Sequence, residues 1–147
     1  MTNAPAQSSP LAPLEQALLT YFAPWIQSMG LRVEAAGPDS VTLRLPCGPA
    51  LAREGGMVCG QALMAAADTA MALALVHHFG AFRPCTTVQM NTAFLKPLAG
   101  QDGLVTATVL RAGRSLAFGE IDIRGAADKA CVARASTTYA LLAPPPG

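Results

Sequence analysis

The chain has 147 residues, of which 52% are hydrophobic and only 13% are charged, and its formal net charge at neutral pH is +1. A chain of this length can bury about 68–70% of its surface as one domain. The small, balanced charge excludes the basic field that nucleic-acid binding requires, so the expected partner is a small molecule or a second copy of the chain.

The two ends of the chain are expected to add little to a single domain that spans residues 1–147. Residues 1–12 lack the basic and apolar regions of a secretory signal and predict a loose leader, and residues 143–147 predict a tail. We therefore expect a cytoplasmic protein. The four cysteines form no CxxC pair and the two histidines complete no zinc spacing, so the sequence predicts reduced thiols and no metal site.

The first third of the chain predicts an amphipathic helix followed by a hairpin. Apolar residues recur at helical spacing over residues 13–29, although Pro24 interrupts this stripe. Residues 31–36 and 40–46 then predict two strands around a turn that contains Gly, Pro and Asp. In the second strand apolar residues alternate with Thr and Arg, which is typical of a strand with one buried face.

The stretch from Gly55 to Phe79 predicts one long helix that begins near residues 58–60, after a loop over residues 47–57. Its apolar residues lie on every face, which favours a buried central helix. The run is long enough to cross a membrane, but Asp68 at its centre would cost about 3 kcal/mol on insertion scales. We therefore expect no membrane span, and the lone carboxylate needs another explanation.

After this helix the hydrophobic pattern changes to a period of two, which predicts strands. The expected segments are residues 87–94, 104–110, 115–123 and 130–142. The last three are separated by turn sequences that suit hairpins, so the second half predicts an antiparallel meander. About six strands beside a helix that is apolar all round predict an α+β fold, in which a curved antiparallel sheet wraps around the helix.

Asp68 and the start of the helix are the candidate catalytic groups. The backbone N–H of Gly60 is among the unpaired donors of the first turn, where the helix dipole favours a developing negative charge, as in an oxyanion hole. The two groups lie about 12 Å apart along the helix, so they can act together only across a two-fold dimer with antiparallel helices. The alternative is a structural acid that is hydrogen-bonded to Thr69, Thr87 or a backbone group.

The motif at the helix and the order of the segments resemble the PaaI-type acyl-CoA thioesterases of the hotdog fold, over roughly residues 31–142. That family shows an Asn, then Gly-x-x-His-Gly-Gly, then an acid nine residues after the His. This chain has Arg53, then Gly-Met-Val-Cys-Gly-Gln at residues 56–61, then Asp68 in register. Two later segments, TTVQMNTAFLKPLAG and VLRAGRSLAFGEIDI, are similar to the strands that follow the helix in the family.

The resemblance implies hydrolysis of an acyl- or aryl-CoA thioester by a homodimer or homotetramer, with coenzyme A as part of the substrate and no resident cofactor. By position, Asp68 corresponds to the catalytic acid, acting as general base or nucleophile, Gly60 to the oxyanion donor, and Thr87 to the residue that assists the water. The resemblance also implies a set of residues that contact the substrate or coenzyme A, namely Cys59, Gln61, Phe94, Arg111, Gly113, Arg114 and Ser115.

Three departures from the family pattern keep alternatives open. Arg53 replaces the Asn, Cys59 replaces the His and Gln61 replaces the second Gly. A non-catalytic module that binds or senses acyl-CoA is one alternative. A hotdog hydratase or dehydratase is another, although such enzymes usually work with a His and acid pair. A third is Cys59 as nucleophile, because a helix N-terminus can activate a thiol.

Overall fold

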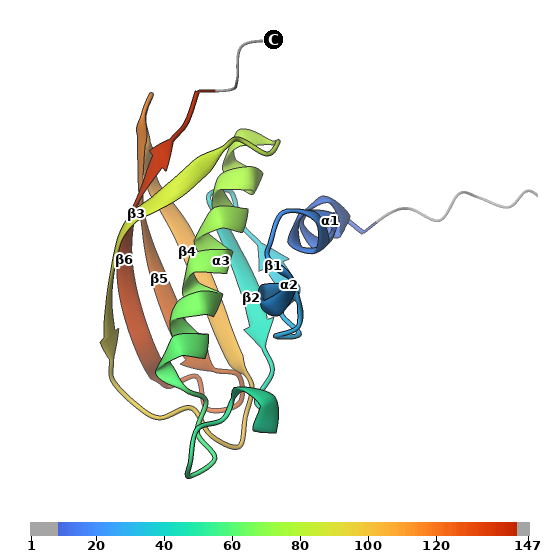
Figure 1. Cartoon of the computed structure of the whole chain (residues 1–147), viewed down its shortest axis with the longest axis vertical. Helices are drawn as coiled ribbons and strands as arrows, with labels where there is room; N and C mark the ends of the chain where they lie inside the picture. Colours follow the sequence, from blue (N-terminus) through green and yellow to red (C-terminus); the bar gives the residue numbers. More distant parts are fainter. Residues whose placement is uncertain (1–8, 144–147) are drawn as a thin grey trace, which may run out of the picture.

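A six-stranded antiparallel sheet curves around one long helix, α3 (Figure 1). The computed structural model describes residues 9–143. The strands are β1 (Arg32–Ala36), β2 (Ser40–Leu45), β3 (Cys85–Phe94), β4 (Gly103–Ala112), β5 (Leu116–Gly125) and β6 (Cys131–Leu141). Every pair of neighbouring strands is antiparallel. The predicted α+β fold, with a curved sheet around a central helix, is therefore confirmed.

The strand order β1-β2-β4-β5-β6-β3 corrects one part of the sequence interpretation. Strands β4, β5 and β6 form the expected meander, but β3 pairs with β6 at the far edge of the sheet and does not lie beside β4. The connection from Leu95 to Asp102 contains a proline and a glycine and is too long for a tight hairpin. This connection carries the chain from the edge strand β3 past β6 and β5 to β4.

Helix α3 (Gly60–Phe79) begins and ends close to its predicted bounds. Cys59 is its extended N-cap residue, and Gly80 ends it in the left-handed conformation with φ at +71°, which a glycine adopts without a steric penalty. The helix is long and apolar enough to cross a membrane, with a mean hydropathy of 1.3. Its contacts with β2, β4 and β5 bury most of that apolar surface, so packing inside the sheet accounts for its composition.

The region predicted as one interrupted helix over residues 13–29 contains two helices, α1 (Ala12–Thr20) and α2 (Pro24–Gln27). Pro24 is the first residue of α2, where its missing N–H costs nothing, so the proline separates two helices. Helix α1 packs on α3, and a short 3-10 helix, η1 (Pro49–Leu51), lies in the loop before α3. Of the predicted leader and tail, residues 1–8 and 144–147 lie outside the described residues, and Ala12 is already helical.

Candidate active site

Asp68 lies on the part of α3 that faces β3 and β6, and only one of its two carboxylate oxygens is held. Its Oδ1 accepts a hydrogen bond of 2.8 Å from the Thr87 hydroxyl and a short one from the Tyr139 hydroxyl. The Tyr139 oxygen also lies 2.9 Å from the backbone carbonyl oxygen of Asp68. Within residues 9–143 no donor reaches Oδ2. The structure therefore fixes one oxygen and leaves the other free to react.

Tyr139 is a site residue that sequence reasoning missed. It pairs directly with Thr87 in the ladder between β6 and β3, and only 3% of it is exposed. Burial, together with the nearby Asp68 carboxylate, raises the pKa of Tyr139 well above its usual range, so the phenol stays protonated and acts as a donor. A tyrosine in a strand is ordinarily a core residue. The signal that singles it out is the pairing with β3, which the sequence interpretation did not contain.

A cavity of about 430 Å³ opens beside Asp68, within the range of small-molecule sites. One face of α3 lines it at helical spacing, through Ala65, Asp68, Ala72, Val76 and Phe79. The other walls come from the start of β3, the end of β6 and the segment around α2. The Asp68 carboxylate thus borders a hollow whose surface is mostly apolar.

Cys85 also lines this cavity, as the first residue of β3. Burial and the negative charge of Asp68 raise the pKa of the Cys85 thiol, which keeps it protonated and weakly nucleophilic. All four cysteines are free. Among the described residues no group of three or more potential ligand side chains could hold a metal ion.

The N-terminus of α3 presents free backbone donors, as the sequence predicted. Cys59 makes no side-chain cap, and within the described part of the chain the backbone N–H of Gly60 has no acceptor. Gly60 lines a second hollow, of about 300 Å³, with Arg53, Phe94 and Lys96. A Cβ atom at Gly60 would lie 3.5 Å from the Phe94 ring, which shows how closely this ring covers the start of the helix. Gln61 is exposed next to it.

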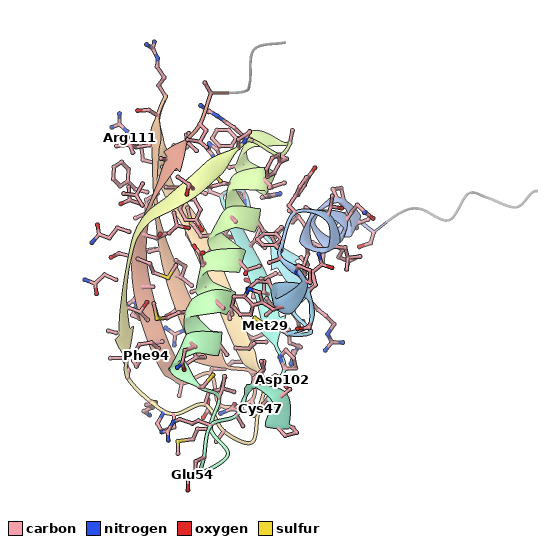
Figure 2. All side chains as sticks on the ribbon, viewed as in Figure 1. Met29, Cys47, Glu54, Phe94, Asp102 and Arg111 are labelled. Carbon is pink, nitrogen blue, oxygen red and sulfur yellow. The ribbon has the colours of Figure 1, made fainter. Side chains whose placement is uncertain are left out.

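The hairpin between β4 and β5 carries the remaining predicted contacts and lies far from Phe94. Figure 2 shows Arg111 and Phe94 toward opposite ends of the sheet. Arg83, which lines the Asp68 cavity, donates a hydrogen bond of 2.9 Å to the backbone carbonyl of Arg114, which links the hairpin to that cavity. Gly113 and Ser115 lie in the same turn.

The structure therefore divides the predicted site residues of one chain into two groups. Asp68 and Thr87 share the 430 Å³ cavity, to which Arg83 connects the hairpin of Arg111, Gly113, Arg114 and Ser115. Gly60 and Phe94 line the second hollow, and Cys59 and Gln61 flank Gly60 in sequence. Asp68 lies eight residues after Gly60 in the helix, which separates the two groups by about 12 Å.

Several solved structures resemble this chain. A conserved protein from Pseudomonas aeruginosa shares 29% sequence identity, with a TM-score of 0.73 over 82% of this chain and 95% of that chain. Zebrafish thioesterase superfamily member 2 shares 24% identity, with a TM-score of 0.81 over 92% of this chain and 100% of that one. A thioesterase from Haemophilus influenzae shares 20% identity, with a TM-score of 0.81 and 92% of each chain covered. At these two lower identities the likeness shows a common fold.

The sequence itself gives a more direct assignment. No functionally curated protein matches the chain. Residues 55–132, more than half of the chain, match the sequence profile of the thioesterase superfamily, and this region contains α3, β3, β4 and β5. The chain therefore belongs to the thioesterase superfamily, whose general activity is thioester hydrolysis.

Proposed function

We propose that this protein hydrolyses an acyl- or aryl-CoA thioester to the free acid and coenzyme A. The observation that carries the proposal is the arrangement of Asp68. One carboxylate oxygen is held by Thr87 and Tyr139, and the other is free beside a mostly apolar cavity. A carboxylate in this position can act on a water molecule or on a carbonyl group while the acyl chain lies in the cavity.

In the general-base route, Oδ2 of Asp68 accepts a proton from a water molecule whose oxygen attacks the thioester carbonyl, and Thr87 helps to position that water. The carbonyl oxygen becomes an oxyanion, which accepts a hydrogen bond from the Gly60 N–H of a second subunit. The C–S bond then breaks, and the coenzyme A thiolate takes the proton from Asp68. In the nucleophilic route, the carboxylate oxygen attacks the carbonyl carbon, and the C–S bond breaks to release the coenzyme A thiolate, which takes a proton from water. Water then hydrolyses the resulting mixed anhydride to the free acid and restores the Asp68 carboxylate.

The same proposal places coenzyme A against residues outside the cavity, on the hairpin between β4 and β5 and around Gly60. Arg111 and Arg114 are cations on an exposed hairpin, suited to the phosphates of coenzyme A. Phe94, Cys59 and Gln61 border the Gly60 amide and would contact the thioester end of the substrate. Because Gly60 and Asp68 are distant within one chain, the complete site requires a homodimer, either alone or within a homotetramer.

The proposal is tested by replacing Asp68 with Asn, which keeps the shape of the side chain, and with Ala. Both variants should lose about 10²–10⁴-fold in hydrolysis rate, the usual contribution of a general base. Release of free thiol from a panel of acyl- and aryl-CoA thioesters measures the rate. Glu120→Gln, at an exposed carboxylate outside the cavity, is the matched control and should behave like the wild type.

Two results would contradict the proposal. Full thiol release by Asp68→Ala would show that Asp68 is not the catalytic acid. Saturable binding of acyl-CoA without thiol release by the wild type, at any chain length, would identify a binding module.

A further inference from the structure

Two stacked aromatic rings line the Asp68 cavity near the end of α3. Tyr21 and Phe82 stack with their ring centroids 4.2 Å apart and their planes 18° from parallel, and both side chains line the cavity. Tyr21 directly follows α1, whereas Phe82 lies between α3 and β3. The contact therefore joins two segments that are far apart in the sequence.

The cavity has a defined length because it follows one face of α3. At about 1.5 Å per residue, the helix advances roughly 16 Å from Asp68 to Phe79. The small side chain of Ala72 and the apolar side chain of Val76 line the wall between them. An acyl group with its carbonyl at Asp68 would extend along this face and meet the end of α3 and the stacked rings.

Contacts of neighbouring residues flank both sides of the stack. The backbone N–H of Tyr21 donates to the Ala17 carbonyl at 3.0 Å. On the other side, the Arg83 guanidinium lies 5.1 Å from the centre of the Phe79 ring and is hydrogen-bonded to the Arg114 carbonyl. Tyr21 is 49% exposed and Phe82 48% exposed, so the two rings form the boundary between cavity and solvent.

We propose that Tyr21 and Phe82 form an aromatic stop that sets the maximum length of the acyl group the protein accepts. This inference rests on the proposed acyl-CoA function. Each methylene that enters the apolar cavity should raise kcat/KM about fourfold, the value expected for burying one such group. An acyl chain that reaches the stop must separate the two rings or leave its further methylenes in water. Longer acyl chains therefore show no further increase in kcat/KM.

The test compares the wild type with Tyr21→Ala, Phe82→Ala and the double variant, on straight-chain acyl-CoA substrates from acetyl to palmitoyl. In each variant the ratio of long-chain to short-chain kcat/KM should rise, and the preferred chain length should increase. Because the stack needs both rings, the double variant should add little to either single variant. Leu19→Ala, at an exposed leucine of α1 that does not line the cavity, is the control and should keep the wild-type ratio.

A second measurement separates failure of the stop from failure of the proposed function. Affinities for non-hydrolysable alkyl-CoA thioethers of the same lengths report the stop without turnover. An unchanged length preference in Tyr21→Ala and Phe82→Ala, in rates and affinities, would overturn the stop even if the wild type is an active thioesterase. Phe82→Leu, which removes the ring but keeps an apolar side chain, replaces Phe82→Ala if that variant does not fold.

Discussion

At the scale of single residues, hydrogen bonds orient the Asp68 carboxylate beside its largely apolar cavity. Two hydroxyl donors, from Thr87 and Tyr139, converge on Oδ1. Hydrogen bonds to an ionised carboxylate are stronger than those between neutral groups. They also fix the rotation of the carboxylate, so that Oδ2 is the oxygen left without a donor among the described residues. Tyr139 is thus a positioning residue.

Replacing Tyr139 with Phe should test this role, because the ring stays in the core and only the hydroxyl is lost. A hydrogen bond to a charged group contributes about 1.5–3 kcal/mol, so loss of the fixed orientation of Asp68 should lower kcat by about tenfold or more. KM should change less than kcat, because the ring still lines the cavity. Thr138→Val, at the neighbouring residue of the same strand, is the control. An unchanged kcat would leave Tyr139 with a packing role alone.

The same variant has a second readout in stability. The pKa of Tyr139 is raised in the folded protein, so the folded state keeps a proton that the unfolded chain loses above about pH 10. The resulting stabilisation is complete below that pH and is lost as the pH rises towards the folded-state value. Urea denaturation should therefore show a smaller alkaline loss of stability in Tyr139→Phe. The part of that loss caused by the Cys85 thiol, whose pKa is also raised, should remain.

At the scale of elements, the contact between α3 and β5 depends on a glycine. A Cβ atom at Gly119 would overlap the Met71 thioether and lie 3.0 Å from the Thr108 carbonyl oxygen. Met71 is fully buried, so it can withdraw only by displacing closely packed neighbours. Gly119→Ala should therefore lower the free energy of unfolding by about 1–3 kcal/mol, as measured by urea denaturation. Gly48→Ala is the control, because nothing lies within 4 Å of its added Cβ. Equal stability of the two variants would contradict this account of the packing.

Among the helices and strands, some features could be predicted from the sequence and others could not. Local signals placed the termini of α3 well, because Gly80 and the all-round apolar pattern depend on the helix itself. Asp68 and Thr87 could be identified as candidates, and their hydrogen bond is present. The position of β3 could not be predicted, because pairing with β6 depends on contacts between distant parts of the chain. Tyr139 was missed for the same reason, since its role exists only once β6 lies beside β3.

At the scale of the whole molecule, β3 is an edge strand, and its outer side pairs with no other described strand. It is ten residues long, contains no charged residue and exposes Val88 and Phe94, at 59% and 50%. Proteins usually protect a long apolar edge with charges, a bulge or another element, because its free backbone groups can pair with a second chain. The bulge near Val88 disturbs only the start of the strand. This edge supports the proposed homodimer. It lies close to Asp68, because the Thr87 hydroxyl of β3 donates a hydrogen bond to the Asp68 carboxylate.

The proposed division of the site between two subunits can be tested by combining two variants that are each expected to be inactive. Asp68→Ala removes the acid, and Gly60→Pro removes the amide donor. Proline suits the first helical position, and the preceding Cys59 already has the extended backbone that proline requires, with φ at −69° and ψ at 152°. Gly60→Ala is the matched control, because it keeps the N–H and places its Cβ at an ordinary contact distance from Phe94.

Each variant alone should be inactive if the complete site draws Asp68 from one subunit and Gly60 from the other. A mixed dimer of the two variants then contains one site in which both groups are intact. Co-expression in equal amounts should give half mixed dimers, and hence about a quarter of wild-type thiol release, since a two-fold dimer has two equivalent sites. If both groups acted within one chain, neither subunit of the mixed dimer would contain a complete site. Co-expression would then restore no hydrolysis, and the inter-subunit site would be wrong.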